Sequence, residues 1–189
     1  MAVVDIATFV ADLKDLAGDQ GFHIHDERHF VESYSMRQAW EVDLHPIHAC
    51  GGPLDLHLAI EVEPRTMIAF EDLILELTDP EGEIPDEHHL PLILTWAMPP
   101  LPKAPDLLVL ATDLAGIAGP DLPLEVTALD NYMSLLDAPE RSLSIVSRLT
   151  ASLSRIYQGQ EDLGPTLPLA GKVCEFLLDS APAWLGDAF

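Results

Sequence analysis

The amino-acid sequence predicts an α+β fold, in which an N-terminal helix and a three- to four-stranded antiparallel meander precede a helical C-terminal half. Two changes of pattern lead to this prediction. Apolar and polar residues alternate with a period of two between residues 40 and 98, and apolar residues recur at helical spacing after residue 105. A proline-rich run separates the two patterns. Strands followed by helices are typical of the α+β class.

The first helix is predicted over residues 5–17, where apolar side chains recur at three and four positions, with Asp5 as its N-cap and Gly18 as its end. Residues 40–47 and 54–63 follow as two strands, because leucine, valine and isoleucine alternate there with polar residues.

A short loop is expected between these two strands. If Cys50-Gly51-Gly52 is a three-residue hairpin loop, His45 faces His57 and Asp43 faces Ala59. This register places the leucines of both strands on one face of the sheet.

Residues 70–78 fit both periods, since Leu73, Leu75 and Leu77 alternate like a strand while other apolar residues fit a helix. The following Asp-Pro-Glu-Gly, residues 79–82, has good type I turn chemistry. We therefore predict a strand over residues 70–78 and another over 92–98.

Four helices are predicted after the prolines, from apolar residues at helical spacing over 107–115, 126–136, 146–156 and 169–177. The third, extending over 140–158, has the best N-terminal signal, with Asp137 before Pro139 and Glu140. The chain thus divides into an acidic α+β region (1–98), a proline-rich linker (99–105) and a helical region (106–189) packed on the first as one domain.

The charge of the chain restricts its partners. There are 32 Asp and Glu against 9 Lys and Arg, a net charge of −23, and Lys103 is the only basic residue between Met67 and Glu140. Such a surface repels phosphate, which argues against direct nucleic-acid binding and favours a basic protein partner. The two cysteines lie far apart, no apolar stretch is long enough to span a membrane, and the N-terminus lacks a basic signal region. These features predict a cytoplasmic protein.

The leading functional prediction is a non-enzymatic interaction protein that engages its partner through the acids between residues 61 and 87. In its acidity, first helix and meander, the chain looks broadly like secretion chaperones and other acidic adaptor modules, which implies a chaperone, an inhibitor or antagonist, or an adaptor. Trp40, Trp96 or Trp184 would supply an apolar anchor, because tryptophan is common at binding hot spots. The predicted partner-binding residues are Glu61, Glu63, Glu71, Asp72, Glu76, Asp79, Glu81, Glu83, Asp86, Glu87 and Trp96. A DNA mimic and a structural subunit of a larger assembly are the alternatives within this class.

A metal-dependent hydrolase or oxygenase is the alternative from another class. All eight histidines lie before residue 90, and the predicted hairpin would bring His45, His57, Asp43 and Asp55 onto one face. Imidazole and carboxylate groups bind zinc, manganese and iron. No HExxH or CxxC spacing occurs, however, and a solvated polar sheet face explains the same residues. The leading prediction therefore includes no cofactor.

Two weaker patterns complete the candidate sites. His25 and His29 would lie one turn apart if residues 26–34 were helical, but two histidines are fewer than a metal site needs. Arg141, Arg148 and Arg155 would form one stripe on the predicted helix. That stripe would bind an anion, dock a second copy of the chain, or pair with acids of the same molecule.

Overall fold

The computed structural model describes residues 4–77, 83–132, 140–161 and 163–186. In chain order its elements are α1 (Ile6–Asp19), β1 (Phe22–Val31), β2 (Gln38–Pro46), the 3-10 helix η1 (Ile47–Ala49), β3 (Asp55–Val62), α2 (Pro64–Glu76), β4 (His89–Ala97), α3 (Leu107–Ala118), β5 (Glu125–Asn131), β6 (Glu140–Ser152), α4 (Leu153–Tyr157) and α5 (Thr166–Leu185). The strands form one antiparallel sheet in the order β1-β2-β3-β4-β6-β5.

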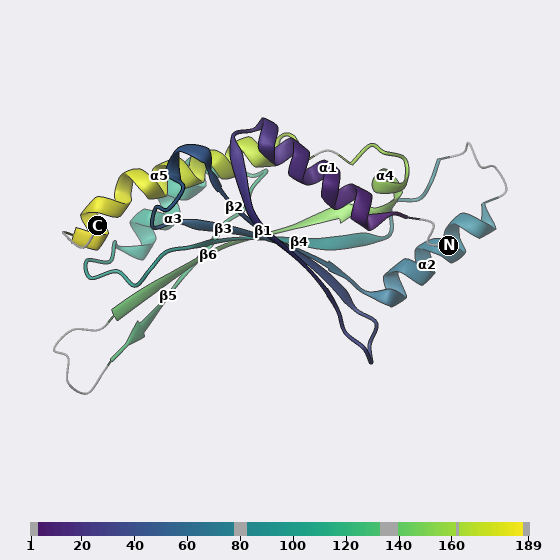
Figure 1. Cartoon of the computed structure of the whole chain (residues 1–189), viewed down its shortest axis with the longest axis horizontal. Coiled ribbons are helices and arrows are strands. Elements are labelled where there is room, and N and C mark those ends of the chain that lie inside the picture. The colour runs from purple at the N-terminus through teal and green to yellow at the C-terminus, as the bar shows by residue number, and fades with distance from the viewer. Residues whose placement is uncertain (1–3, 78–82, 133–139, 162, 187–189) are drawn as a thin grey trace.

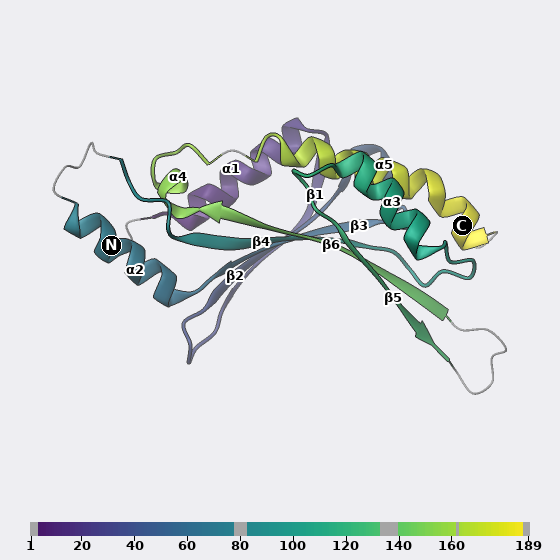
Figure 2. The same ribbon diagram turned by 180° about the vertical axis from the view of Figure 1, so that it is seen from behind.

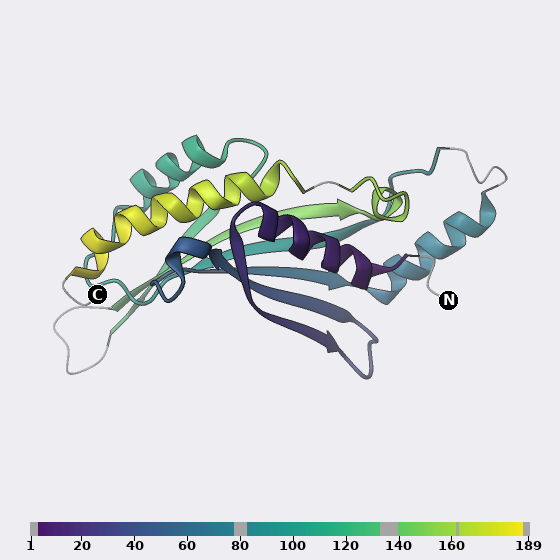
Figure 3. The same cartoon turned by 45° about the horizontal axis from the view of Figure 1, so that its top comes forward.

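Helices cover one face of this sheet. Helices α1, α3 and α5 lie side by side on that face, while α2 extends from one end of the molecule (Figures 1 and 2). Figure 3 shows the same helical layer from a tilted view, with the sheet beneath it. Among the described helices, none is long and apolar enough to cross a membrane.

Strand register separates the buried side chains from the polar ones. The covered face carries the row Val42, Leu58, Leu94 and Ser147, in which each residue pairs with the next across β2, β3, β4 and β6 and all are at most 2% exposed. The opposite face, here termed the uncovered face, carries the neighbouring row Asp43, His57, Thr95 and Val146. These four side chains are half-buried. The core therefore lies between the sheet and the helical layer.

The mixed α+β class is confirmed, with six strands rather than three or four and with helices in both halves of the chain. The first helix begins as predicted, because Asp5 accepts a hydrogen bond from the Thr8 backbone N–H at 3.1 Å. It ends at Asp19, one residue beyond the predicted stop at Gly18. The strands predicted near residues 40–47, 54–63 and 92–98, and the helices near 107–115 and 169–177, also form.

The predicted strand over residues 70–78 is wrong, because residues up to Glu76 belong to α2. The helix begins with Pro64 at its first position, where proline's fixed φ angle and missing N–H are tolerated. Its single buried side chain, Phe70, faces the body of the protein. The turn predicted at 79–82 lies outside the described residues.

The helices predicted over 126–136 and 140–158 are also wrong. Residues 125–131 form β5 and 140–152 form β6, and only 153–157 are helical. Within β6, the buried residues Leu143, Ile145 and Ser147 alternate as a strand requires. Half-buried Val146 on the other face makes the same segment fit helical spacing as well. Asp137 and Pro139, the predicted cap, lie outside the described residues.

The hairpin between β2 and β3 has a different register from the one predicted. Residues 47–54 separate the strands, because η1 forms after Pro46, so the loop is longer than Cys50-Gly51-Gly52. Asp43 consequently pairs with His57, and Glu41 with Ala59. The leucines still share the covered face, because the register differs by an even number of residues.

The predicted linker, residues 99–105, contains a buried contact. Leu101 is 1% exposed and forms an isolated antiparallel bridge with Arg141, to whose carbonyl its N–H donates at 2.8 Å. Further along, the N–H of Lys103 donates to the carbonyl of Trp184 in α5 at 3.0 Å. These hydrogen bonds join the segment to both β6 and the C-terminal helix.

Candidate functional site

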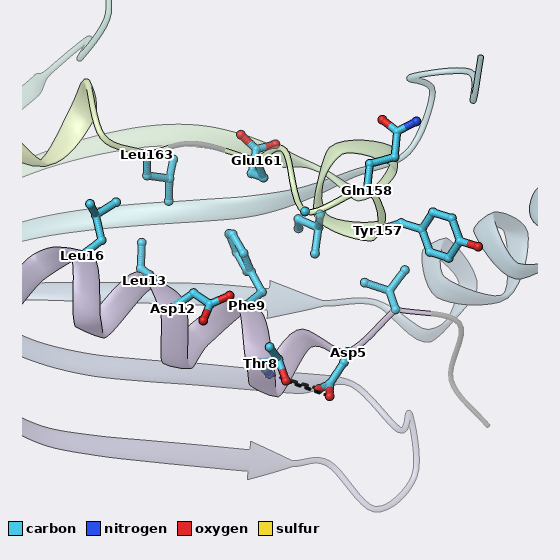
Figure 4. Close-up of a pocket in the computed structure, with 13 residues that line it drawn as sticks. Asp5, Thr8, Phe9, Asp12, Leu13, Leu16, Tyr157, Gln158, Glu161 and Leu163 are labelled. Atoms are coloured by element: carbon cyan, nitrogen blue, oxygen red, sulfur yellow. Dashed lines mark hydrogen bonds between the residues drawn. The ribbon is translucent and has the colours of Figure 1, made fainter. Parts of the chain in front are cut away.

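A groove lies between α1 and the segment that joins α4 to α5. Its volume is about 650 Å³, within the range of ligand-binding pockets. Figure 4 shows Phe9, Leu13 and Leu16 of α1 along one wall and Leu163 on the other. The groove is lined by Val4, Asp5, Thr8, Phe9, Asp12, Leu13, Leu16, Ile156, Tyr157, Gln158, Gly159, Glu161 and Leu163.

The amphipathic pattern of α1 creates one wall of this groove. Val10 and Leu13 are at most 4% exposed and fix the helix to the body. Phe9 and Leu16 lie at the margin of that apolar stripe and are half-buried. The apolar stripe of α1 is wider than the part of it that packs against the sheet. Phe9 and Leu16, at its margin, therefore line the groove.

Three carboxylates line the groove, and its described lining residues include no lysine, arginine or histidine. Asp5 caps α1. Hydrogen bonds from the backbone N–H of Thr8, which has the larger effect, and from the Thr8 hydroxyl hold the pKa of Asp5 below its usual value. Glu161 accepts the backbone N–H of Ser152 at 2.6 Å. Asp12 is exposed and has no partner among the described residues. Asp12 is therefore the carboxylate most available to a bound cation.

Helix α2 continues this surface beyond one end of the groove. Phe70 contacts Tyr157, a groove residue, at a ring distance of 6.1 Å, and His88 at the same distance. At 100° per residue, Ile68 and Leu75 lie on the side of α2 opposite Phe70. They are 57% and 79% exposed, and Asp72 lies between them. The outer face of α2 is thus both apolar and acidic.

The predicted partner-binding acids divide into groups. Glu61 and Glu63 both pair with Arg37, and Glu71 is half-buried in α2. The exposed members are Asp72, Glu76, Glu83, Asp86 and Glu87. Asp79 and Glu81 lie outside the described residues. The exposed acids thus lie on two neighbouring parts of the chain, helix α2 and the segment that precedes β4.

Asp86 is exposed but engaged in the fold. The Ser152 hydroxyl donates to Asp86 at 2.5 Å and the Ser154 hydroxyl donates at 3.2 Å. Both hydrogen bonds lower the pKa of Asp86, and that from Ser152 has the larger effect. Asp86 thereby joins the segment before β4 to the start of α4.

The expected tryptophan anchor at Trp96 is wrong, because Trp96 is 1% exposed in the core. Trp40 is 7% exposed and stacks on His29, with ring centroids 3.9 Å apart. Trp184 is half-buried in α5. Exposed or half-buried apolar side chains occur instead along the groove and on the outer face of α2.

Asp43 and His57 meet on the uncovered face, but the other two predicted metal ligands do not join them. His57 Nδ1 lies 2.6 Å from Asp43 Oδ1, and Arg28 contacts Asp43 at 2.9 Å. Partial burial raises the pKa of Asp43, but hydrogen bonds from His57 and Arg28 outweigh it and hold the pKa below its usual value. Because Arg28 already supplies the positive charge, this pair is a poor cation site.

His45 belongs to a different cluster, at the end of β2. His45 Nε2 lies 3.1 Å from His23 Nδ1 and 2.9 Å from Cys50 Sγ, and the remaining distance, from Cys50 Sγ to His23 Nδ1, is 3.8 Å. The pKa of His45 is lowered mainly by burial and, to a smaller extent, by the nearby His23 and His25. Alternation along residues 22–24 is the sequence signal for a strand that places His23 beside His45.

Asp55 and His25 lie close to this cluster. Both line a cavity of about 310 Å³ that also contacts His45 and Asp43. The strand β1 shifts register between Ile24 and Asp26, so that His25 occupies a β-bulge and is not one helical turn from His29. The ring centroid of His25 is 5.6 Å from that of His45. Of the predicted ligands, only His45 belongs to the group of described residues, His23, His45 and Cys50, whose donor atoms lie close enough together to hold one metal ion.

The predicted arginine stripe does not exist, because Arg141 and Arg148 are seven positions apart on a strand and point to opposite faces. Arg141 makes a two-pronged ion pair with Asp130 at 2.5 and 2.7 Å. Arg148 contacts Glu125 at 2.8 Å, and Arg155 of α4 donates to the carbonyl of Gln160 at 3.1 Å. Each arginine thus has a partner in its own chain.

Comparison of this chain with protein-family models, with curated proteins and with solved structures gives no match. What the protein binds must therefore be inferred from the chemistry and placement of its own side chains.

Proposed function

We propose that the protein is a non-enzymatic interaction protein that binds a basic, amphipathic segment of a partner protein in the groove between α1 and the α4–α5 connection. The observation that supports this proposal most strongly is the composition of the groove. Apolar side chains line both of its walls, both walls also carry carboxylates, and none of the lining residues that the structure describes is cationic. An apolar side chain flanked by lysine or arginine is complementary to such a lining.

The dimensions of the groove suit a short segment. Along α1 it extends from Asp5 to Leu16, which at 1.5 Å per residue is about 16 Å. That length accommodates about three turns of helix or about five residues of extended chain. A chaperone, an antagonist and an adaptor would each bind such a segment in the same way. They would differ in what binding does to the partner protein.

The charge of the whole molecule supports capture of a basic segment. A net charge of −23 attracts a cationic partner over a distance set by the ionic strength and raises its rate of association. The exposed acids of α2, which is joined to the groove through Phe70 and Tyr157, extend this field beyond the groove. Binding should therefore weaken steeply as salt is added.

Asp12→Lys should weaken capture of the partner by about tenfold or more, because it places a cation beside the cations of the bound segment. The matched control is Asp15→Lys, which makes the same change in net charge at an exposed position of the same helix that does not line the groove. Each tagged variant is used to capture partners from host lysate at low salt, and the protein released by stepwise salt is quantified by mass spectrometry.

Wild type and Asp15→Lys should retain the same lysine- and arginine-rich partner. Equal losses in the two variants would show that total charge, and not the groove, determines binding. A partner retained undiminished at high salt would contradict the electrostatic basis of the proposal.

A further inference from the structure

Three metal-binding side chains converge at the end of the β1–β2 pair. His23 Nδ1, His45 Nε2 and Cys50 Sγ all lie within 4.8 Å of one another, at separations of 3.1, 2.9 and 3.8 Å. In a tetrahedral zinc site, bonds of about 2.0 Å to nitrogen and 2.3 Å to sulfur place two nitrogens about 3.3 Å apart and nitrogen and sulfur about 3.5 Å apart. The three observed separations differ from these values by about 0.2 to 0.6 Å, which small side-chain rotations can supply.

The local backbone holds these donors in place. His23 and His45 are directly paired across β1 and β2, so their side chains project from the same face. The Ile47 N–H donates to the Gly21 carbonyl at 3.0 Å, which ties η1 to the start of β1. Gly51 has a φ of +79°, and a Cβ on Gly52 would lie 2.9 Å from the Ala49 carbonyl oxygen. Two glycines thus permit the turn that places Cys50 over the histidines.

The surroundings offer a fourth coordination position. The cavity of about 310 Å³ beside His45 is lined by His25 and Asp55, and His25 occupies the bulge of β1. Bulges commonly redirect a side chain next to a functional site. His45 is only 7% exposed, so an ion beside it would be partly shielded from water while remaining accessible from the cavity.

We infer that His23, His45 and Cys50 form a binding site for a divalent cation of the zinc type, with its fourth position open to the cavity that His25 and Asp55 line. Two imidazoles and a thiolate suit zinc, whereas manganese and magnesium prefer oxygen ligands. This site shares no residue with the groove and does not depend on the proposed function.

Cobalt(II) is a suitable probe, because it occupies zinc sites and gives a thiolate-to-metal charge-transfer absorption. The full chain, reduced and freed of metal by a chelator, is titrated with cobalt and then with zinc. We expect one cobalt per chain, the charge-transfer absorption, and its loss when zinc displaces cobalt. The other cysteine does not contribute such a signal, because Cys174 is fully buried and burial raises the pKa of its thiol to about 12.

The variants distinguish this site from adventitious binding by surface histidines. Cys50→Ser should abolish the charge-transfer absorption, and His23→Gln should weaken cobalt binding by more than tenfold, since even outer-sphere changes typically cost that much. The matched control is His48→Gln, an exposed histidine of η1 outside the cluster, which should bind as wild type does. Asp12→Lys should also leave cobalt binding unchanged.

A second measurement, which uses only chains that keep all three ligands, does not depend on whether the ligand variants fold. Zinc should protect Cys50 from alkylation in the wild type and in His48→Gln. The inference is overturned if wild type gives no charge-transfer absorption, if Cys50→Ser retains it, if zinc leaves the alkylation rate unchanged, or if His48→Gln weakens binding as much as His23→Gln.

Discussion

Leu94→Glu is expected to unfold the protein, whereas Ile93→Glu, one residue earlier on the same central strand, is expected to leave it folded. Leu94 is 1% exposed on the covered face, and its neighbours across β3 and β6 are Leu58 and Ser147. A carboxylate there would have no cation to pair with and would have to remain buried. We expect the free energy of unfolding to fall by more than about 4 kcal/mol.

The control position faces the other way. Ile93 is half-buried on the uncovered face, where it pairs with Ala59 and Arg148. A glutamate beside Arg148 gains an opposite charge across the strands, so the loss of stability should stay below about 1.5 kcal/mol. Urea unfolding followed by circular dichroism measures both variants. Equal destabilisation would contradict the assignment of one covered and one uncovered face.

Phe70→Ala is expected to release α2 from the rest of the protein without unfolding the sheet. Phe70 is the only buried side chain of this 13-residue helix and is fully buried. Removing a buried phenylalanine costs about 3–5 kcal/mol, and a helix of this length is marginal in water without tertiary contacts. Amide hydrogen exchange in α2 should therefore accelerate about 100-fold or more.

The same experiment has an internal reference and a matched variant. Amides of the central strands β3 and β4 should exchange at the wild-type rate in Phe70→Ala. Ile68→Ala removes an exposed apolar residue of the same helix and should leave exchange in α2 nearly unchanged. If Ile68→Ala has as large an effect as Phe70→Ala, α2 is held by its outer face and not by Phe70.

Sequence periodicity predicts elements well where only one face of the element is apolar. Helix α1 and strand β3 have a single apolar face and form as predicted. Strand β6 carries Leu143 and Ile145 on one face and Val146 on the other, so its sequence fits both periods. In helix α2, Leu73 and Leu75 occupy alternate positions although neither is fully buried, and this alternation fits a strand as well as a helix. Whether such a segment becomes a helix or a strand depends on its tertiary contacts, which cannot be read from the periodicity of the sequence.

The candidate sites depend on a register that a single sequence specifies poorly. The alternation of β2 and β3 predicts their shared covered face, but η1 lengthens the loop and moves His57 opposite Asp43. His45 is thereby left to meet His23 and Cys50. The groove is formed by α1 and a segment more than 130 residues later, and no local pattern could bring Phe9 and Leu163 together.

Site-specific photo-crosslinking most directly tests the central claim, that a basic partner binds in the groove. A photoreactive residue replaces Gln158, an exposed residue of the groove, or Thr127, an exposed residue of β5 on the uncovered face. We predict that the Gln158 position cross-links to a lysine- and arginine-rich segment of the captured partner at low salt, and that the Thr127 position does not. Cross-linking from Thr127 and none from Gln158 would contradict the claim and assign the partner to the uncovered face of the sheet.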